Sequence, residues 1–172
     1  MALFGRSKKK EDGEADGNST VVPPPDQAER GSDPKAEPSA EVVIGTAPAG
    51  NYRKVLVKPG SRGWGKGLVI APQPGRDLIY SVTGGGIHPV AQRIADLSGG
   101  RAFDGFKSKA KFEEIACAVI DCGGTARIGV YPMKGVMTVD VHGVSPSGPL
   151  MKFINEENFV SGTSVTDIEV VE

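Results

Sequence analysis

The chain has few of the residues that build the commonest metal and disulfide sites. Its 172 residues include only two cysteines, two histidines and one tryptophan. Cys117 and Cys122 lie in one apolar segment without a second pair, so neither a disulfide framework nor a four-ligand zinc site is indicated. We expect a reduced, cytoplasmic protein that needs no metal or other cofactor.

Long apolar runs are also missing. No segment approaches the roughly eighteen apolar residues that a helix needs to cross a bilayer. In residues 1–10 the charges follow a very short apolar patch, which is unlike a signal peptide. Neither sign of charge dominates, because the formal net charge is -1. Scattered lysines without a clustered basic face argue against nucleic-acid binding, so we expect metabolite or protein partners.

Residues 1–50 differ in composition from the rest of the chain. They hold six of the thirteen prolines, and acidic residues outnumber basic ones there by nine to six. Such a stretch buries too little apolar surface to offset the entropy lost on ordering. We therefore expect a disordered N-terminal extension over residues 1–50 and one folded domain over residues 51–172.

The pattern of residues 51–172 predicts a single strand-rich α/β or α+β domain with about two helices. Strands are expected at 52–58, 68–71, 77–82, 115–120, 125–131, 137–141 and 164–171. One helix should begin at Pro89 and stop at Gly99, and a short second one should cover residues 150–157. The run 115–120 is apolar throughout, which is typical of a strand buried on both faces at the centre of a sheet.

A candidate phosphate-binding loop follows this central strand directly. Cys122 is its candidate nucleophile, and Gly123 and Gly124 allow successive backbone N–H groups to form an anion-binding nest. Arg127 adds a planar, permanently charged fork that suits phosphate oxygens, and Thr125 completes the set of candidate phosphate-binding residues. These groups would favour the thiolate form of Cys122.

The residues alone leave a second interpretation of this loop open. Cys122 could be a small buried hydrophobe at a glycine turn, with Arg127 paired to a surface carboxylate. Asp121 would disfavour a thiolate unless its side chain points away, as strand alternation permits. Cys117 lies within the apolar run, where a packing role is favoured.

The two histidines are candidates for an accessory role at the loop. His88 precedes the expected helix and His142 follows an expected strand, so either could approach the loop as an acid, a base or a phosphate ligand. Two histidines are weak evidence for such a role. A helix-capping or surface position is the favoured interpretation of each.

A family resemblance is carried by residues 118–125, which read AVIDCGGT, followed by Arg127. This segment resembles the phosphocysteine segment of the glucitol/sorbitol-specific enzyme IIB family of sugar phosphotransferase systems. Further landmarks follow in the family's order: Gly63-Trp64-Gly65, Asp104-Gly105-Phe106-Lys107, Ser147-Gly148-Pro149-Leu150 and Val160-Ser161-Gly162. The resemblance covers the chain from about residue 52 to its C-terminus.

The resemblance implies a phosphoryl carrier. Cys122 would accept the phosphoryl group from a phosphohistidine of the IIA component and pass it to a hexitol such as glucitol (sorbitol). Family members often continue into part of their membrane-spanning IIC component, whereas this chain ends at Glu172. We therefore expect IIC to be a separate polypeptide that holds this chain at the inner face of the cell membrane.

Two alternative functions remain open at this point. A cysteine-dependent phosphatase also holds phosphate with a cysteine, a glycine-rich loop and an arginine, but its usual spacing has five intervening residues, and Cys122 and Arg127 are separated by four. A non-catalytic regulatory module with the same fold is the other alternative.

Overall fold

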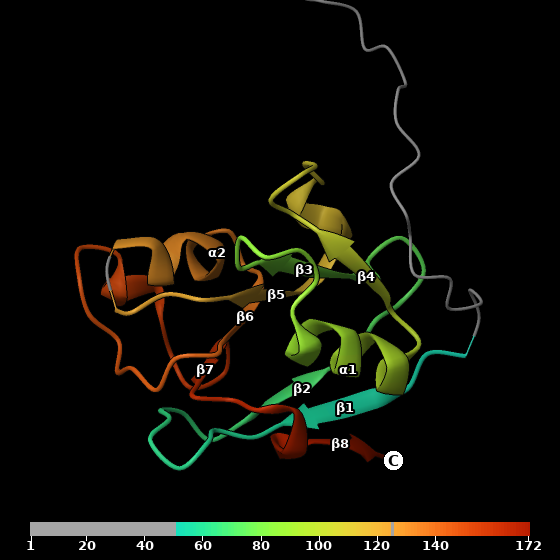
Figure 1. Ribbon diagram of the computed structural model, residues 1–172, viewed down its shortest axis with the longest axis horizontal. Coiled ribbons are helices and arrows are strands. Elements are labelled where there is room, and N and C mark those ends of the chain that lie inside the picture. The colour runs from blue at the N-terminus through green and yellow to red at the C-terminus, as the bar shows by residue number, and fades with distance from the viewer. Residues whose placement is uncertain (1–50, 125) are drawn as a thin grey trace, which may run out of the picture. The chain divides into compact units, whose positions relative to one another are not determined.

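The computed structural model in Figure 1 describes residues 51–124 and 126–172. The strands are β1 (Lys54–Val57), β2 (Leu68–Ile70), β3 (Leu78–Val82), β4 (Arg101–Asp104), β5 (Ile115–Ile120), β6 (Met137–Asp140), β7 (Phe159–Ser161) and β8 (Ile168–Val171). The α-helices are α1 (Pro89–Ser98) and the single turn α2 (Val130–Met133). The described residues also contain the 3-10 turns η1 (Phe112–Glu114), η2 (Ala126–Gly129), η3 (Met151–Phe153) and η4 (Val165–Asp167). The expected extension over residues 1–50 and Thr125 lie outside the described residues.

Five parallel strands form the larger sheet, in the order β4-β3-β5-β6-β7. The apolar run predicted to be central is β5, with two strands on each side and every residue buried. The predicted mixed fold is therefore confirmed. Because parallel strands all end at one edge, the loop after β5 lies beside those after β3 and β6, which is where open α/β sheets gather ligand sites.

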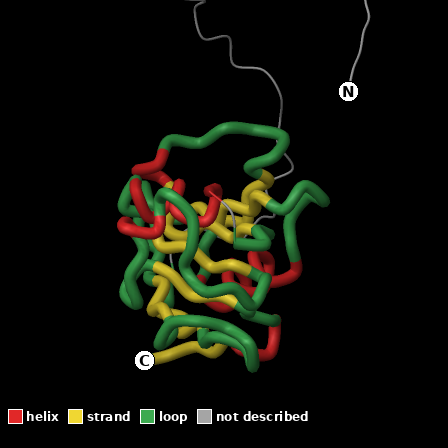
Figure 2. The backbone as a smooth tube through the Cα atoms, turned by 90° about the vertical axis from the view of Figure 1, so that its left-hand side faces the viewer, coloured by secondary structure: helices red, strands yellow, loops and turns green. Residues whose placement is uncertain are grey.

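A smaller antiparallel sheet, in the order β2-β1-β8, supports the larger one through α1. Figure 1 shows α1 between the two sheets. The buried side of the helix, Val90, Ala91, Ile94 and Ala95, joins one apolar cluster with residues of both sheets. Much of the chain around the strands is loop, as the tube in Figure 2 shows.

Helix α1 begins and ends as its sequence predicts. Pro89 occupies the first turn, and Nδ1 of His88 accepts a hydrogen bond of 3.2 Å from the Val90 N–H. Gly99 ends the helix with a φ of 76°, a left-handed conformation that glycine adopts without strain. The capping role favoured for His88 is confirmed.

The strand expected over residues 125–131 is wrong. Ala126–Gly129 forms the turn η2 and Val130–Met133 forms α2. Ile128 is fully buried and Tyr131 packs against the same apolar cluster. Residues three apart lie on one face of a helical turn, so this spacing buries both side chains without a strand.

The helix expected over residues 150–157 is also wrong beyond its first turn, since only Met151–Phe153 is helical. Asn158 ends the turn because its Nδ2 donates to the Phe153 carbonyl and its Oδ1 accepts from the Asn155 N–H. Asparagine side chains that bond to nearby backbone compete with helix formation in this way. The last strand begins later than expected, at Ile168.

Two short strands, β4 and β7, were not expected from the sequence. They have four and three residues and lie at the two edges of the parallel sheet. Segments of this length carry too little pattern to be recognised without their pairing partners. Among the helices of the described residues, none has the length and apolar composition needed to cross a bilayer.

Candidate functional site

Cys122 is held at the carboxyl edge of the parallel sheet by its own backbone. Its N–H donates to Oδ1 of Asp140 at 3.2 Å, and the N–H of His142 donates to the same oxygen at 3.0 Å. Asp140 ends β6 and lies opposite Ile120, the last residue of β5. One carboxylate therefore joins the two loops that leave neighbouring central strands.

Asp140 is the residue of this site that the sequence interpretation missed. It is 0% exposed, and no donor among the described residues reaches its Oδ2. Burial raises its pKa to about 6, while the hydrogen bonds from the His142 and Cys122 amides act in the opposite direction. A polar residue at the end of a strand that pairs with β5 was the available signal.

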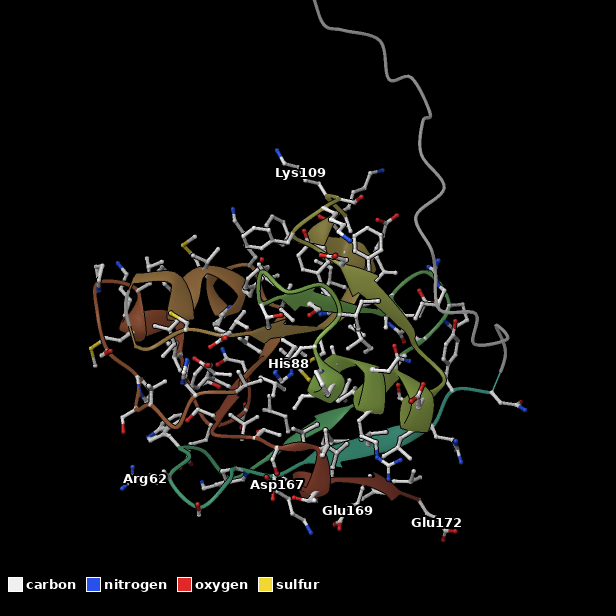
Figure 3. All side chains as sticks on the ribbon, viewed as in Figure 1. Arg62, His88, Lys109, Asp167, Glu169 and Glu172 are labelled. Carbon is white, nitrogen blue, oxygen red and sulfur yellow. The ribbon has the colours of Figure 1, made fainter. Side chains whose placement is uncertain are left out.

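The side chains of Asp121 and His142 meet at the same edge and form an ion pair when the imidazole is protonated. Nε2 of His142 lies 2.5 Å from Oδ1 of Asp121, and their side chains are 56% and 40% exposed. The carboxylate of Asp121 thus points toward His142, whose side chain is partly in contact with solvent. His142 is placed beside the candidate loop, whereas Figure 3 shows His88 at the start of α1, where it caps the helix.

A pocket of about 300 Å³ opens beside Cys122. Its lining is mainly apolar and comes from the ends of two strands, the loop after β4 and α2: Val82, Phe106, Ile120, Asp121, Cys122, Val130 and Tyr131. Phe106 is 64% exposed at this pocket. Although only 8% exposed, Cys122 is therefore next to space that another molecule can enter.

The two glycines after Cys122 have different structural roles. Gly124 has a φ of 90°, and its carbonyl accepts a 2.5 Å hydrogen bond from Oγ of Ser147, so its backbone conformation requires glycine. A Cβ added at Gly123 would meet no atom within 4 Å, and its φ is not positive. The fold therefore does not require glycine at position 123.

The remaining predicted members of the phosphate loop stay predictions. Thr125 and the side chain of Arg127 lie outside the described residues, although the backbone of Arg127 belongs to η2. The proposed nest of N–H groups likewise remains an expectation. The Cys122 N–H cannot be counted as an open member of such a nest, because it donates to Asp140.

Cys117 has none of the site's features. It lies in the middle of β5, is 0% exposed and packs in the main apolar cluster. Burial raises the pKa of its thiol to about 12, so the thiolate is essentially absent near neutral pH. The predicted packing role of Cys117 agrees with this environment.

A small apolar cluster packs against the loop that contains Cys122. Ile120, Cys122, Ile128 and Phe159 are buried together, with the partly buried Trp64 against them. The Trp64 and Phe159 ring centroids are 6.0 Å apart. The backbone N–H of Trp64 donates to Oγ of Ser161 at 2.8 Å, which fixes the glycine-rich loop after β1 to β7.

Comparison with known proteins agrees with the resemblance in the sequence. The family model described as "Sorbitol phosphotransferase enzyme II N-terminus" matches residues 54–172. A protein of Clostridium beijerinckii named "PTS system glucitol/sorbitol-specific EIIB component" is 39% identical over 122 residues, which cover 70% of this chain and 36% of that protein. No solved structure matches. The chain belongs to the family of the sorbitol phosphotransferase enzyme II N-terminus.

Proposed function

We propose that this chain is the B component of a glucitol/sorbitol-type phosphotransferase system and carries a phosphoryl group on Cys122. The observation that carries the proposal is the position of this cysteine, at the carboxyl end of the central parallel strand and beside a pocket, in a chain of this family. The relative named as an EIIB component supports the same role. The component would work in the cytoplasm, at the inner face of the membrane through its IIC partner.

The proposed reaction has two transfers. In the first, the Cys122 sulfur attacks the phosphorus of a phosphohistidine on the IIA component, so that the P–N bond breaks and an S–P bond forms. In the second, a hydroxyl of the hexitol bound in the IIC component attacks the same phosphorus, so that an O–P bond forms, the S–P bond breaks and the hydroxyl proton passes to the departing sulfur or to water. Gly123, Gly124, Thr125 and Arg127 would hold the phosphoryl oxygens, since such transfers depend mainly on positioning and charge stabilisation.

The experiment that tests the proposal is direct phosphorylation. The chain is incubated with its phosphorylated IIA component, and the intact mass is measured. We expect one phosphate on Cys122, with the acid and base stability of a thiophosphate rather than of a phosphohistidine. Rapid turnover of a generic aryl phosphate would instead identify a phosphatase. If the chain showed neither phosphoryl acceptance nor phosphatase activity, the regulatory alternative would remain.

The first prediction concerns Gly123, where an added Cβ would meet no atom within 4 Å. Gly123→Ala should slow phosphoryl acceptance by about 10- to 100-fold, because a methyl group would stand where phosphoryl oxygens approach the backbone. The free energy of unfolding should change by less than about 0.5 kcal/mol. Transfer rates and chemical denaturation measure the two effects.

Gly85→Ala is the matched control for this prediction. Gly85 is also exposed, has no positive φ and would place its Cβ within 4 Å of nothing. Its variant should accept phosphate at the parent rate. Equal rates for both variants would remove Gly123 from the phosphate site.

The second prediction concerns Arg127, whose role is expected from the sequence alone. Arg127→Lys keeps the positive charge but loses the planar fork, so transfer should slow by about 10- to 1,000-fold while stability changes by less than about 1 kcal/mol. Arg93→Lys, on the exposed side of α1, is the control. Unchanged transfer in Arg127→Lys would place this side chain outside the site, and an unfolded variant would assign it a structural ion pair.

A further inference from the structure

Asp140 holds an unusual position for a carboxylate. It sits between two neighbours at the end of β6, opposite Ile120 of β5 and Ser161 of β7. Its Oδ1 accepts the N–H groups of Cys122 and His142, which belong to different loops, and its Oδ2 has no donor among the described residues. The negative charge is therefore fixed next to the candidate nucleophile and is not fully compensated.

The fold alone does not explain why this residue is acidic. Burial raises the Asp140 pKa from 3.8 to about 6, so the folded state binds the proton more tightly than the unfolded chain does. The stabilisation from protonation is complete below pH 3.8 and is lost as the pH rises through 6. At neutral pH the ionised carboxylate thus opposes folding, whereas a neutral amide oxygen could accept the same two hydrogen bonds.

We propose that Asp140 is a positioning residue for Cys122, whose buried carboxylate fixes the loops after β5 and β6 and whose charge opposes negative charge on the Cys122 sulfur. The inference rests on the proposed phosphoryl transfer. A carrier has to keep its phosphoryl group until the acceptor is in place. When the S–P bond breaks, the sulfur departs with negative charge, and a carboxylate beside it opposes that charge, so it slows loss of the phosphoryl group to water.

The other ionisable groups around Asp140 modify this effect without replacing it. Among the described residues these are Asp121, which adds negative charge, and His142, which interacts favourably with the carboxylate and pairs with Asp121. From β7, the paired residue is Ser161, which carries no charge. Asp140 is the one of the two aspartates that bonds to the Cys122 backbone.

The test measures how fast iodoacetamide alkylates Cys122 as a function of pH, in a Cys117→Ala background. This readout needs no phosphoryl donor. We expect Asp140→Asn to shift the midpoint of the rate profile to lower pH by about 0.5 to 2 units, because a neighbouring negative charge is removed. Asp140→Ala should in addition speed hydrogen exchange at the Cys122 and His142 amides, which lose their acceptor.

Asp104→Asn is a matched control. Asp104 ends the parallel strand β4, is buried, and accepts the N–H groups of Phe106 and Lys107 through its Oδ1, but it has no bond to the Cys122 backbone. Its variant should leave the alkylation midpoint unchanged. A purely structural role of Asp140 would alter thermal unfolding in Asp140→Asn and leave the midpoint where it was, which would overturn the proposal.

A second arm separates this inference from the proposed function. The phosphorylated parent and Asp140→Asn proteins are followed during spontaneous hydrolysis, and we expect the variant to lose its phosphoryl group at least about threefold faster, because no carboxylate opposes the charge on the departing sulfur. Equal lifetimes and equal alkylation midpoints would exclude a role of Asp140 in the chemistry of Cys122. A parent protein that accepts no phosphate would refute the proposed function, and the alkylation result would still decide the relation between Asp140 and Cys122.

Discussion

Replacing Cys122 with serine is expected to abolish phosphoryl acceptance. The serine hydroxyl is nearly the same size as the thiol, so the loop and its bond to Asp140 should persist. A hydroxyl, however, does not ionise near neutral pH and is a poor nucleophile without a dedicated base. Incubation with the phosphorylated IIA component and intact-mass measurement should show full modification of the parent and none of the variant.

Cys117→Ala is the matched control for this experiment. Cys117 is fully buried five residues earlier in the same segment, and its thiol pKa of about 12 excludes it as a nucleophile. Alanine keeps the site apolar, and the small cavity should lower stability by roughly 1 kcal/mol. This variant should accept one phosphate like the parent. Phosphate on Cys122→Ser, or none on a folded Cys117→Ala protein, would contradict the assignment.

Gly63→Ala is expected to have the largest effect on stability. A Cβ at this position would lie 1.9 Å from the carbonyl oxygen of Ser161 and 2.9 Å from the Gly60 nitrogen. Both neighbours are backbone atoms, so no side-chain rotation can relieve the clash. The loop after β1 would have to leave β7, and we expect the free energy of unfolding to fall by at least about 3 kcal/mol.

Denaturant unfolding followed by circular dichroism measures this loss. Gly85→Ala is again the control, because its methyl group would point into open space. We expect its unfolding free energy to stay within about 0.5 kcal/mol of the parent. If Gly63→Ala were as stable as Gly85→Ala, the close approach between this loop and β7 would be wrong.

The parts of the fold that could be predicted are those that local sequence determines. An apolar run long enough to be recognised gave β5, and a proline start with a glycine stop gave α1. The strand expected over residues 125–131 was wrong because apolar residues in a short segment fit a helical turn as well as a strand. Strands β4 and β7 depend on pairing partners that lie elsewhere in the chain.

The candidate site also contains one residue that local sequence indicates and one that depends on strand pairing. Cys122 could be proposed as the nucleophile because the glycines that follow it are adjacent in sequence. Asp140 was not found because it lies 18 residues further along the chain and meets Cys122 only through the pairing of β5 with β6. Its burial is a property of the whole sheet edge, and a single sequence carries no direct sign of it.

The position of Trp64 has a practical consequence for studying the site. It is the only tryptophan of the chain, and its ring packs with Phe159 against the apolar cluster that contains Cys122. Indole emission depends on the packing and polarity around the ring. The unlabelled protein thus contains one optical reporter beside its candidate nucleophile, so that modification of Cys122 can be followed in real time by stopped-flow fluorescence.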